Sequence, residues 1–493
     1  MTGAVLGRGT LAAVALLWLS APVSAHDLVL VRQPAAAVDP AETEPAGRCL
    51  AGSQIIRLSS DGAERLLTDG FVAACDPAVS FDGGQILFAG RRSADERLQI
   101  WRMDTGGGDV VRITDDPGEA SSPLWVGSLF HLDDQAPTRR IAYLATGHGW
   151  ADGRTGRPAA ALYTADVDGG HPLRISYHLG PDLAPDVLAN GRLVFAAWRP
   201  GEGDGGARLA VMAVNNDGTD LMAFHDNHHG PPYPSSVRVG RDGRVYFIEA
   251  DGRSPLGGGD LSYVTLRRPI HSRTLLASAP GGAYLDPLPL AAGGLLVSYR
   301  PPGRGTVYGL WRIDPLTGDR LERVHGRPDF HYLDAHELAP HPGVKGRSSV
   351  VDISKKTGIF FCISSHITDR PALEHLEAGG ASSLRVIEGL PATTDSTTSA
   401  SVSGERILGE VEIESDGSFQ IEVPAGVPLR FEILDGRGTA LAEQVSWTWV
   451  MPREWRGCIG CHEDREMVAP NILAEAFVKP AVRLGQPEEE KQP

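Results

Sequence analysis

The stretch GRLVFAAW, from Gly191 to Trp198, contains a turn-forming glycine and a basic residue, followed by a run of apolar side chains. A short apolar run that follows a turn residue is typical of a buried β-strand. Five further segments have the same pattern: GQILFAG from Gly84, RIAYLAT from Arg140, GRVYFIEA from Gly243, GGLLVSYR from Gly293 and TGIFFCIS from Thr357. The opening stretch therefore belongs to a repeated unit.

The spacing of the six copies predicts a β-propeller. Equivalent positions in successive copies are separated by 55, 52, 52, 50 and 64 residues. A period of about 50 residues built from strands is typical of propeller blades, because one blade cannot bury both of its faces and is stable only in a ring. Turns rich in Asp, Asn and Gly follow the next strand of a unit, as after LQIWRMD at Leu98.

The two ends of the predicted propeller suggest how the ring closes. The copy at Thr357 has no second half, whereas the segment from Gly52 to Thr68 has two strands without a first half. We expect these N-terminal strands to complete the blade that begins at Thr357, because closure removes the free sheet edges. The prediction is a six-bladed propeller over residues 48–370, after an N-terminal linker over residues 26–47.

The remainder of the chain has a different pattern. Alternating apolar and polar residues, broken at SDG, PAG and DGRG, predict a small β-sandwich over residues 371–450. A c-type haem-binding segment is predicted over residues 451–475, and the polar residues 476–493 are expected to form a disordered tail. The predicted fold class is therefore all-β.

The haem prediction depends on WRGCIGCHEDRE, from Trp455 to Glu466. Cys458, Cys461 and His462 form C-x-x-C-H, the attachment signature of c-type haem. Each thiol can add to one haem vinyl group, and the next side chain, His462, is the expected proximal ligand of the iron. A chance match, a thioredoxin-like pair and a zinc half-site are weaker interpretations, because neither a βαβ context nor a second downstream ligand pair is evident. We predict one covalent haem c.

The N-terminus predicts export. Residues 1–25 contain a positive charge at Arg8, an apolar core from Leu11 to Leu19 and small residues at Val23 and Ala25. This is the pattern of a signal peptide that is cleaved near Ala25, and no later run is long enough to span a bilayer. A periplasmic or otherwise exported protein agrees with the haem motif, since such motifs are loaded outside the cytoplasm.

Composition limits the classes of partner, and the remaining three cysteines have predictable states. A formal net charge of -16 and a pI near 5.5 argue against nucleic acid or an anionic membrane as partner. Cys49 and Cys75 are 26 residues apart and are expected to form a disulfide in an oxidising compartment. Cys362 lies in an apolar strand and is expected to be buried and inert.

The sequence indicates the attachment motif more clearly than it indicates the surroundings of the predicted haem. Trp447, Trp449 and Trp455 precede the motif and form either ordinary sandwich core or a wall for the macrocycle. Only 31 residues follow His462, so we expect the propeller to cover the second face of the haem. The candidates for a distal ligand, none of them favoured, are His225, His228, His229, His325, His331, His336 and His341, with Met451 and Met467 as weaker ones.

Several segments carry a resemblance to a known family. They are RCLAGSQIIRLSSDG, ACDPAVSFDGGQILFAGRR, PDVLANGRLVFAAW, YPSSVR, LRVIEGLP and GCIGCHEDRE, and they extend from about Arg48 to Pro470. Together they resemble the hydrazine synthase alpha-subunit-like family, which has a TolB-type propeller, a middle β-domain and a c-type haem. The resemblance implies a periplasmic multidomain haem protein that works in a complex.

Two departures from that family affect the prediction. Hydrazine synthase has a second haem-binding region, and we do not expect one in this chain. In that enzyme a tyrosine four residues after the motif histidine ligates the iron and leaves the histidine to zinc, whereas the matching residue here is Glu466. We therefore keep His462 as the proximal ligand and do not predict hydrazine synthesis.

Two functions remain open from the sequence. The first is an exported single-haem protein that transfers electrons to a redox partner protein or small molecule, or that serves as a haem oxidoreductase subunit. The second is a propeller scaffold for protein partners with a structural or sensory haem, since propellers host many unrelated activities.

Overall fold

The computed structural model describes most of the chain. The described residues are 27–35, 49–131, 134, 136–153, 155–199, 208–225, 233–250, 257–368, 380–393, 404–461 and 467–485. The predicted signal peptide, most of the predicted linker and the predicted haem ligand His462 lie outside these residues. The distal-ligand candidates His228 and His229 do as well.

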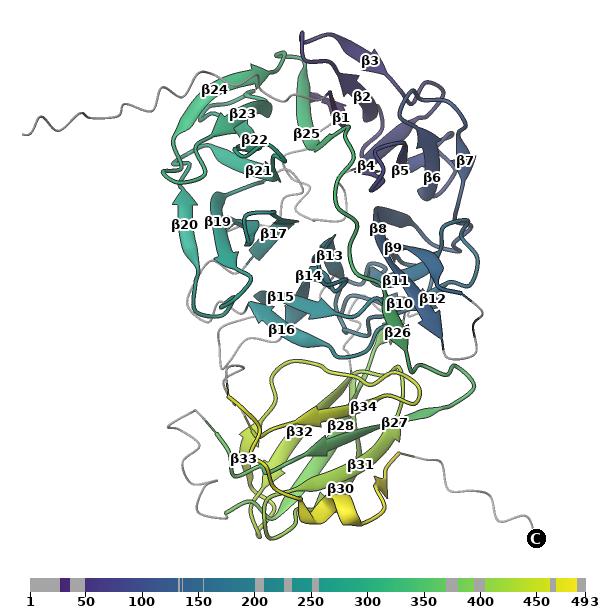
Figure 1. Ribbon diagram of the computed structural model, residues 1–493, viewed down its shortest axis with the longest axis vertical. Helices are drawn as coiled ribbons and strands as arrows, with labels where there is room; N and C mark the ends of the chain where they lie inside the picture. The colour runs from purple at the N-terminus through teal and green to yellow at the C-terminus, as the bar shows by residue number, and fades with distance from the viewer. Residues whose placement is uncertain are drawn as a thin grey trace, which may run out of the picture.

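Six sheets form a ring in the described part of the chain (Figure 1). The first sheet consists of β4 (Ala73–Val79), β5 (Gln85–Arg91), β6 (Gln99–Asp104) and β7 (Val111–Arg112). The second consists of β8 (Ala120–His131), β9 (Thr138–Ala145), β11 (Ala161–Asp166) and β12 (Leu173–Arg174), with β26 (Arg347–Ser349) added parallel to β8. The third consists of β13 (Asp182–Val187), β14 (Leu193–Arg199), β15 (Arg208–Val214) and β16 (Met222–His225).

The next two sheets continue in chain order. The fourth consists of β17 (Tyr233–Val239), β18 (Arg244–Ala250), β19 (Asp260–Thr265) and β20 (Thr274–Ala277). The fifth consists of β21 (Ala283–Pro289), β22 (Leu295–Arg300), β23 (Gly309–Ile313) and β24 (Arg320–His325). The all-β propeller prediction is confirmed, and the apolar runs at Gly84, Arg140, Gly191, Gly243 and Gly293 form the second strand of each of these sheets rather than the first.

The sixth sheet joins the two ends of the propeller. Its order is β25 (Phe330–Glu337), β1 (Leu28–Pro34), β2 (Gln54–Leu58) and β3 (Glu64–Leu66). N-terminal strands therefore close the ring, but their partner is β25 and not the strand at Thr357. The predicted linker over residues 26–47 is also wrong where β1 lies, because β1 supplies the apolar second strand that the sixth unit needs.

The inner strands share a distortion that ties neighbouring sheets together. Each has one non-glycine residue with φ between 45° and 52°, and these are Asp76, Ser122, Ala184, Ser236, Asp286 and Asp334. A shift in strand register accompanies each of them, as expected for a β-bulge. The bulges let acidic side chains reach the next sheet: Asp76 Oδ2 accepts from the Ser122 amide at 2.9 Å, and Asp286 Oδ2 accepts from the Asp334 amide at 3.0 Å.

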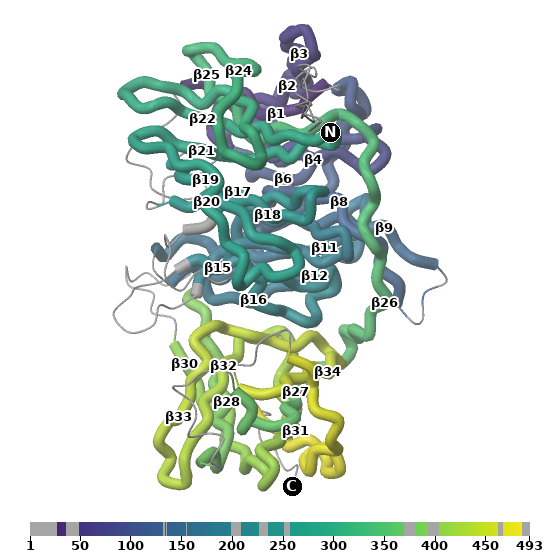
Figure 2. The backbone as a smooth tube through the Cα atoms, turned by 60° about the vertical axis from the view of Figure 1, so that its left-hand side comes forward, coloured from purple at the N-terminus to yellow at the C-terminus, as the bar shows by residue number. Residues whose placement is uncertain are grey.

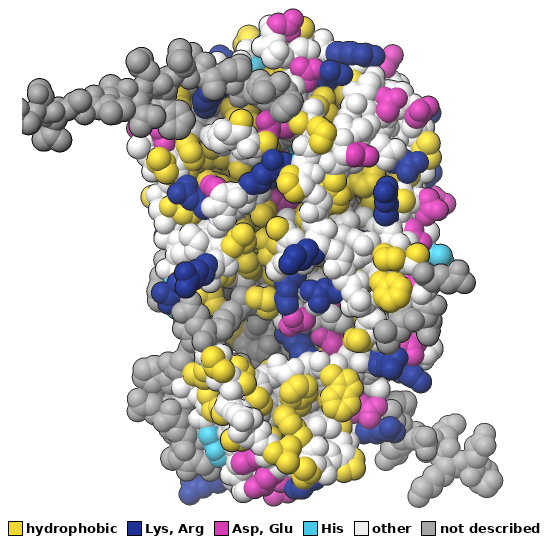
Figure 3. Space-filling view, viewed as in Figure 1, with side chains coloured by type: hydrophobic (Ala, Val, Ile, Leu, Met, Phe, Trp, Pro, Cys, Tyr) yellow, Lys and Arg dark blue, Asp and Glu magenta, His cyan; other side chains and the backbone are white. Residues whose placement is uncertain are grey.

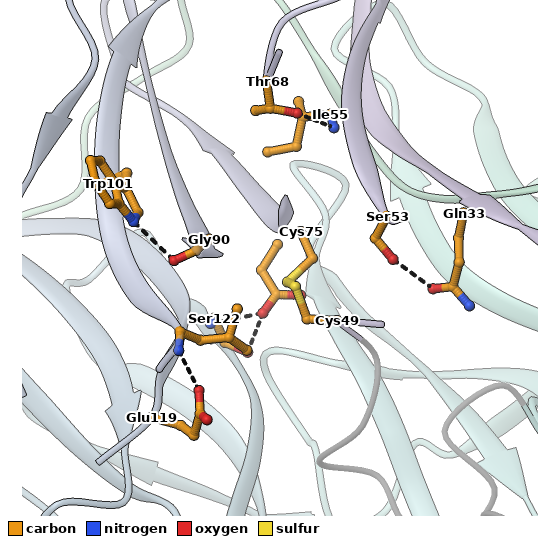
Figure 4. The surroundings of a disulfide bond; sticks show 12 residues. Gln33, Cys49, Ser53, Ile55, Thr68, Cys75, Gly90, Trp101, Glu119 and Ser122 are labelled. Atoms are coloured by element: carbon orange, nitrogen blue, oxygen red, sulfur yellow. Dashed lines mark hydrogen bonds between the residues drawn. A yellow bond between two sulfur atoms is a disulfide. The ribbon is translucent and has the colours of Figure 1, made fainter. Parts of the chain in front are cut away.

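The predicted disulfide between Cys49 and Cys75 is confirmed (Figure 4). Cys75 belongs to β4, and Cys49 lies just before β2, so the bond links the first sheet to the strands that close the ring. It constrains a loop of 26 residues in the unfolded chain. The disulfide therefore stabilises the closure of the propeller.

Glu64 of β3 adds a polar contact to the same closure. Tyr332 donates to its carboxylate at 2.7 Å, His325 lies 2.8 Å from it and Arg32 forms an ion pair at 2.8 Å. Burial alone would raise the pKa of Glu64, but these hydrogen bonds lower it to about 2. The ionised carboxylate is therefore the form that the folded state prefers.

This preference predicts an acid-sensitive closure. The stabilisation from Glu64 is complete above its unfolded pKa of 4.5 and is lost as the pH falls toward 2. In urea titrations at fixed pH, the free energy of unfolding should fall more steeply between pH 4.5 and 2 in the wild type than in Glu64→Gln. Equal slopes in the two proteins would contradict the prediction.

The C-terminal domain is a β-sandwich, as predicted from the alternating pattern. One sheet has the order β34 (Trp455–Cys458), β27 (Thr357–Cys362), β31 (Phe419–Pro424) and β35 (Val482–Arg483). The other has the order β30 (Gly404–Glu412), β28 (Ser383–Leu390), β32 (Leu429–Leu434) and β33 (Ala440–Glu443). Their apolar side chains meet in one core, which includes Phe360, Val386, Ile421 and Ile433.

Two sequence predictions about this domain are wrong, the second of them over residues 476–485. The apolar strand at Thr357 is β27, which pairs with β31 and β34, so the sandwich begins at Thr357 and not at residue 371. The tail over residues 476–493 was expected to be disordered, yet the 3-10 helix η4 (Glu475–Val478) and β35 lie within or at its start. Pairing of β35 with β31 satisfies backbone groups, a gain that composition does not show.

The propeller and the sandwich pack directly against each other (Figures 1 and 2). A short strand of the second propeller sheet, β10 (Trp150–Ala151), pairs with β29 (Ala392–Thr393) of the sandwich. Residues 338–346 cross one face of the ring between β25 and β26 before the chain enters the sandwich (Figure 1). Backbone pairing thus fixes the position of the sandwich beneath the second and third sheets.

Candidate functional site

The two motif cysteines lie at the end of an edge strand of the sandwich. β34 runs parallel to β27, with Trp455 opposite Ile359 and Cys458 opposite Cys362. The turn after β34 is held by the chain beyond β27: the Ile363 amide donates to the Cys458 carbonyl at 3.0 Å, and the Cys461 amide donates to the Ile367 carbonyl at 2.8 Å. The segment between the cysteines therefore has a defined conformation.

The three cysteines near the motif differ in their exposure to solvent. Cys458 and Cys461 are partly exposed, and both pack against the sandwich core. Cys362 is 2% exposed, which confirms its predicted burial, and its Sγ lies 3.9 Å from the Ile459 carbonyl oxygen. The structure thus brings Cys362 next to the motif, a proximity that the sequence separation of nearly a hundred residues conceals.

Gly460 lies where a side chain would not fit. A Cβ on this residue would lie 2.3 Å from the Ile367 carbonyl oxygen, which is part of the backbone and cannot turn away. The same carbonyl accepts the hydrogen bond from Cys461. Any side chain at position 460 would therefore displace the turn that presents both thiols.

Gly460→Ala should weaken the sandwich by about 1–3 kcal/mol, because the added methyl group overpacks the turn. The same change should lower the fraction of chains that carry the predicted haem c, as measured by intact mass. Gly436→Ala is the matched control, since a Cβ at Gly436 meets no atom within 4 Å. Equal unfolding midpoints for the two variants would contradict the prediction.

The three tryptophans before the motif have different roles. Trp447 and Trp449 are 6% and 0% exposed, whereas Trp455 is 63% exposed. Trp449 packs with Met451 against the apolar side chains of β14 and β15, so it belongs to the interface with the propeller. Of the three, only Trp455 has the exposure that a wall for a macrocycle requires.

Polar contacts join the residues around β34 to one propeller turn, residues 215–221. Trp449 Nε1 donates to the Gly218 carbonyl at 3.0 Å, and the Arg456 guanidinium donates to the Leu221 carbonyl. Glu454 accepts from the Asp220 amide and from the Met451 amide, each at 2.7 Å. Burial raises the pKa of Glu454, although Arg456 nearby opposes the shift.

Most described distal-ligand candidates lie far from the motif. His325, His331 and His336 belong to β24 and β25, at the end of the propeller away from the sandwich (Figures 1 and 2). His331 accepts from the Tyr308 amide at 3.1 Å, and burial, with Arg300 nearby, lowers its pKa to about 4. These histidines have structural partners in the propeller.

Of the remaining described candidates, His225, His341 and Met451 are committed to other contacts. His225 Nδ1 lies 2.8 Å from the Pro269 carbonyl oxygen, and His341 packs edge-on against Phe81. The Met451 sulfur would lie 2.7 Å from a Cβ on Gly218, so it is packed into the propeller interface.

His366 is a residue that sequence reasoning missed. Its partly exposed ring lies beside Gly417, and its neighbour Ile367 binds the Cys461 amide. The sequence signal for this residue is the short spacing of Cys362 and His366 in CISSH, but the prediction that this strand belongs to the propeller separates it from the motif.

Exposed apolar residues are concentrated in the chain around and after the motif. Besides Trp455, they include Val468 at 87%, Leu473 at 78%, Val478 at 69% and Ile472 at 53% exposure. Apolar side chains also gather on the sandwich face that carries β34 and β27 (Figure 3). An apolar surface of this kind fits a bound macrocycle, which would remove it from water.

Comparisons with known proteins agree with this architecture. Residues 372–463 match the family described as the hydrazine synthase alpha subunit middle domain. Hydrazine synthase subunit alpha of Kuenenia stuttgartiensis is 23% identical in an alignment 526 positions long, gaps included, that covers 86% of this chain. The chain spans 64% of the length of that relative.

One solved structure shows the same fold. The Kuenenia stuttgartiensis hydrazine synthase structure matches with a TM-score of 0.82 at 21% identity, over 92% of this chain and 71% of that chain. TolB from Acinetobacter baumannii matches with a TM-score of 0.41 at 12% identity, over 63% of this chain and 66% of that chain. In its middle-domain match, its relative and its fold, the chain is similar to the hydrazine synthase alpha subunit.

Proposed function

We propose that the protein is an exported c-type haem protein that transfers electrons or serves as a haem oxidoreductase subunit. The observation that carries the proposal is the defined turn at the end of β34, which holds Cys458 and Cys461 partly exposed beside apolar surface. Two thiols at this spacing, followed by His462, have the ligand chemistry that covalent haem requires.

The chain's own residues would have separate tasks in this site. Cys458 and Cys461 would form the two thioether bonds, and His462 would ligate the iron. Trp455 and the exposed apolar residues after the motif would cover part of the macrocycle and exclude water from it. The haem, when bound, supplies a one-electron iron couple whose potential depends on this cover.

Export is the second part of the proposal. The predicted signal peptide over residues 1–25 supports it, and so does the disulfide between Cys49 and Cys75, since disulfides persist outside the reducing cytosol. None of the helices in the described part of the chain has the length and hydropathy that a bilayer-crossing segment needs.

Absorption spectroscopy tests the haem and its coordination together. Protein made in a host that assembles c-type cytochromes should show the spectrum of a reduced haem and should keep the added haem mass after denaturation. Addition of carbon monoxide should shift the reduced spectrum if one iron position is open, and no shift would assign electron transfer through six-coordinate iron. Colourless protein without added mass would overturn the proposal.

A scaffold in a larger assembly is the second candidate function. The relative supports this candidate, because hydrazine synthase subunit alpha is named as one subunit of a larger enzyme. The propeller would then bind a protein partner, and the haem would be structural or sensory. A defined complex that keeps its mass in light scattering when both motif cysteines are serine would favour this candidate, whereas a complex that requires haem would oppose it.

A further inference from the structure

A separate cavity lies between the third and fourth sheets of the propeller. Its volume is about 480 Å³, which is within the range of small-molecule sites. The turns from Leu188 to Arg192 and from Leu266 to His271 form its walls, together with strands β15 and β16. None of its lining residues belongs to the proposed haem segment.

The inner part of the cavity is apolar. Leu188, Ala213 and Phe224 are 5%, 0% and 4% exposed, and Met222 lies beside them. These side chains belong to the apolar cluster that fills the space between the two sheets. A ligand would therefore meet a floor that is already packed and that favours an apolar group.

The outer part of the cavity is basic. Arg192, Arg267, Arg268 and His271 line it, and no Asp or Glu is among the described lining residues. Dark-blue Lys and Arg side chains gather over the turn between β19 and β20 in Figure 3. In a chain with a formal net charge of -16, this local excess of positive charge is the reverse of the average surface.

The arginines differ in how firmly they are held. Arg192 forms an ion pair with Asp220 and donates to the Asp220 carbonyl at 3.2 Å, so its guanidinium is fixed at the cavity edge. Arg267 is exposed and forms no ion pair with any residue in the described ranges. Its guanidinium is therefore available to pair with a ligand anion.

We propose that this cavity binds a small amphipathic anion, with an apolar body on Leu188, Met222 and Phe224 and one carboxylate or sulfonate at Arg267. Burial of the apolar body supplies most of the affinity, and the arginine sets the orientation and selects for negative charge. The site does not depend on the haem, so it goes beyond the proposed function.

Two fluorescent probes of similar shape test the proposal on the full-length protein. Anilinonaphthalene sulfonate carries an aromatic body and one sulfonate, whereas N-phenylnaphthylamine has the same body without charge. The sulfonate probe should bind saturably with one site per chain, and the neutral probe should bind roughly fivefold more weakly or worse. Added salt should weaken binding of the charged probe alone.

Three variants assign the probe to this cavity. Arg267→Glu should weaken binding of the sulfonate probe by roughly fivefold or more and leave binding of the neutral probe unchanged. Ile270→Asp, at the exposed edge of the cavity, should weaken the binding of both probes. Arg437→Glu is the matched control, because Arg437 is an exposed arginine in a turn of the sandwich and should have no effect.

The proposal is overturned if neither probe binds saturably or if Arg267→Glu and Arg437→Glu have equal effects. It is also overturned if Trp455→Ser, and not Arg267→Glu, removes the binding, since the probe would then occupy the exposed apolar surface near β34. Unchanged circular dichroism of Arg267→Glu is required for the comparison, and substitution at this exposed residue is expected to preserve it.

Discussion

Replacement of Cys458 and Cys461 by serine in the same chain is expected to abolish covalent haem attachment completely. A hydroxyl group does not form the thioether bond, so no link to the porphyrin remains in the double variant. Protein from a cytochrome-assembling host should lose both its colour and the added haem mass under denaturing conditions. Each single variant keeps one thiol and should retain haem in a reduced fraction of chains.

Cys362→Ala is the matched control for this experiment. Cys362 lies opposite Cys458 in the parallel pair of β27 and β34 and packs in the same core. It is outside the C-x-x-C-H motif, so its removal should leave the haem mass unchanged and cost only the packing of one buried sulfur. Haem mass in the double variant, or its loss in Cys362→Ala, would contradict the assignment of the attachment site.

Trp449→Ala is expected to destabilise the folded protein by about 3–5 kcal/mol. Trp449 is fully buried between the sandwich and the propeller, and its indole donates to the Gly218 carbonyl at 3.0 Å. The truncation leaves a cavity in the interface and removes the partner of a buried carbonyl group. Urea denaturation followed by far-ultraviolet circular dichroism should show a lower midpoint and a transition that separates into two steps.

Trp455 offers the comparison that isolates the effect of burial. It is six residues further along the chain and is 63% exposed, so Trp455→Ala should change the midpoint of the haem-free protein very little. Trp449→Phe keeps most of the buried ring and loses only the indole hydrogen bond, which should cost about 1 kcal/mol. Similar midpoints for the two alanine variants would show that the interface does not depend on Trp449.

Local patterns in the sequence predicted much of the fold. Five of the six apolar runs are second strands of propeller sheets, and the repeat near 50 residues identified the architecture. The alternation in FQIEVP likewise predicted β31, in which Phe419, Ile421 and Val423 are buried. These predictions succeeded because strand periodicity and turn residues act over a few positions.

The candidate site was predictable only in part. The spacing of Cys458 and Cys461 is local and indicated the haem motif without any structure. The neighbours of the motif, Cys362 and His366, are brought to it by the parallel pairing of β34 with β27. No local pattern indicates which distant strand supplies such a pairing.

The amino-acid sequence by itself determined which segments are apolar strands, where turns fall and which thiols have the C-x-x-C-H spacing. Tertiary structure alone decided that β27 joins the sandwich, that β1 and β25 close the ring, and that Trp449 is interface core while Trp455 is exposed. The physical reason is that an apolar side chain must leave water but does so equally well against any complementary surface. The choice among those surfaces depends on backbone hydrogen bonds and packing between residues far apart in the chain, and these exist only in the assembled fold.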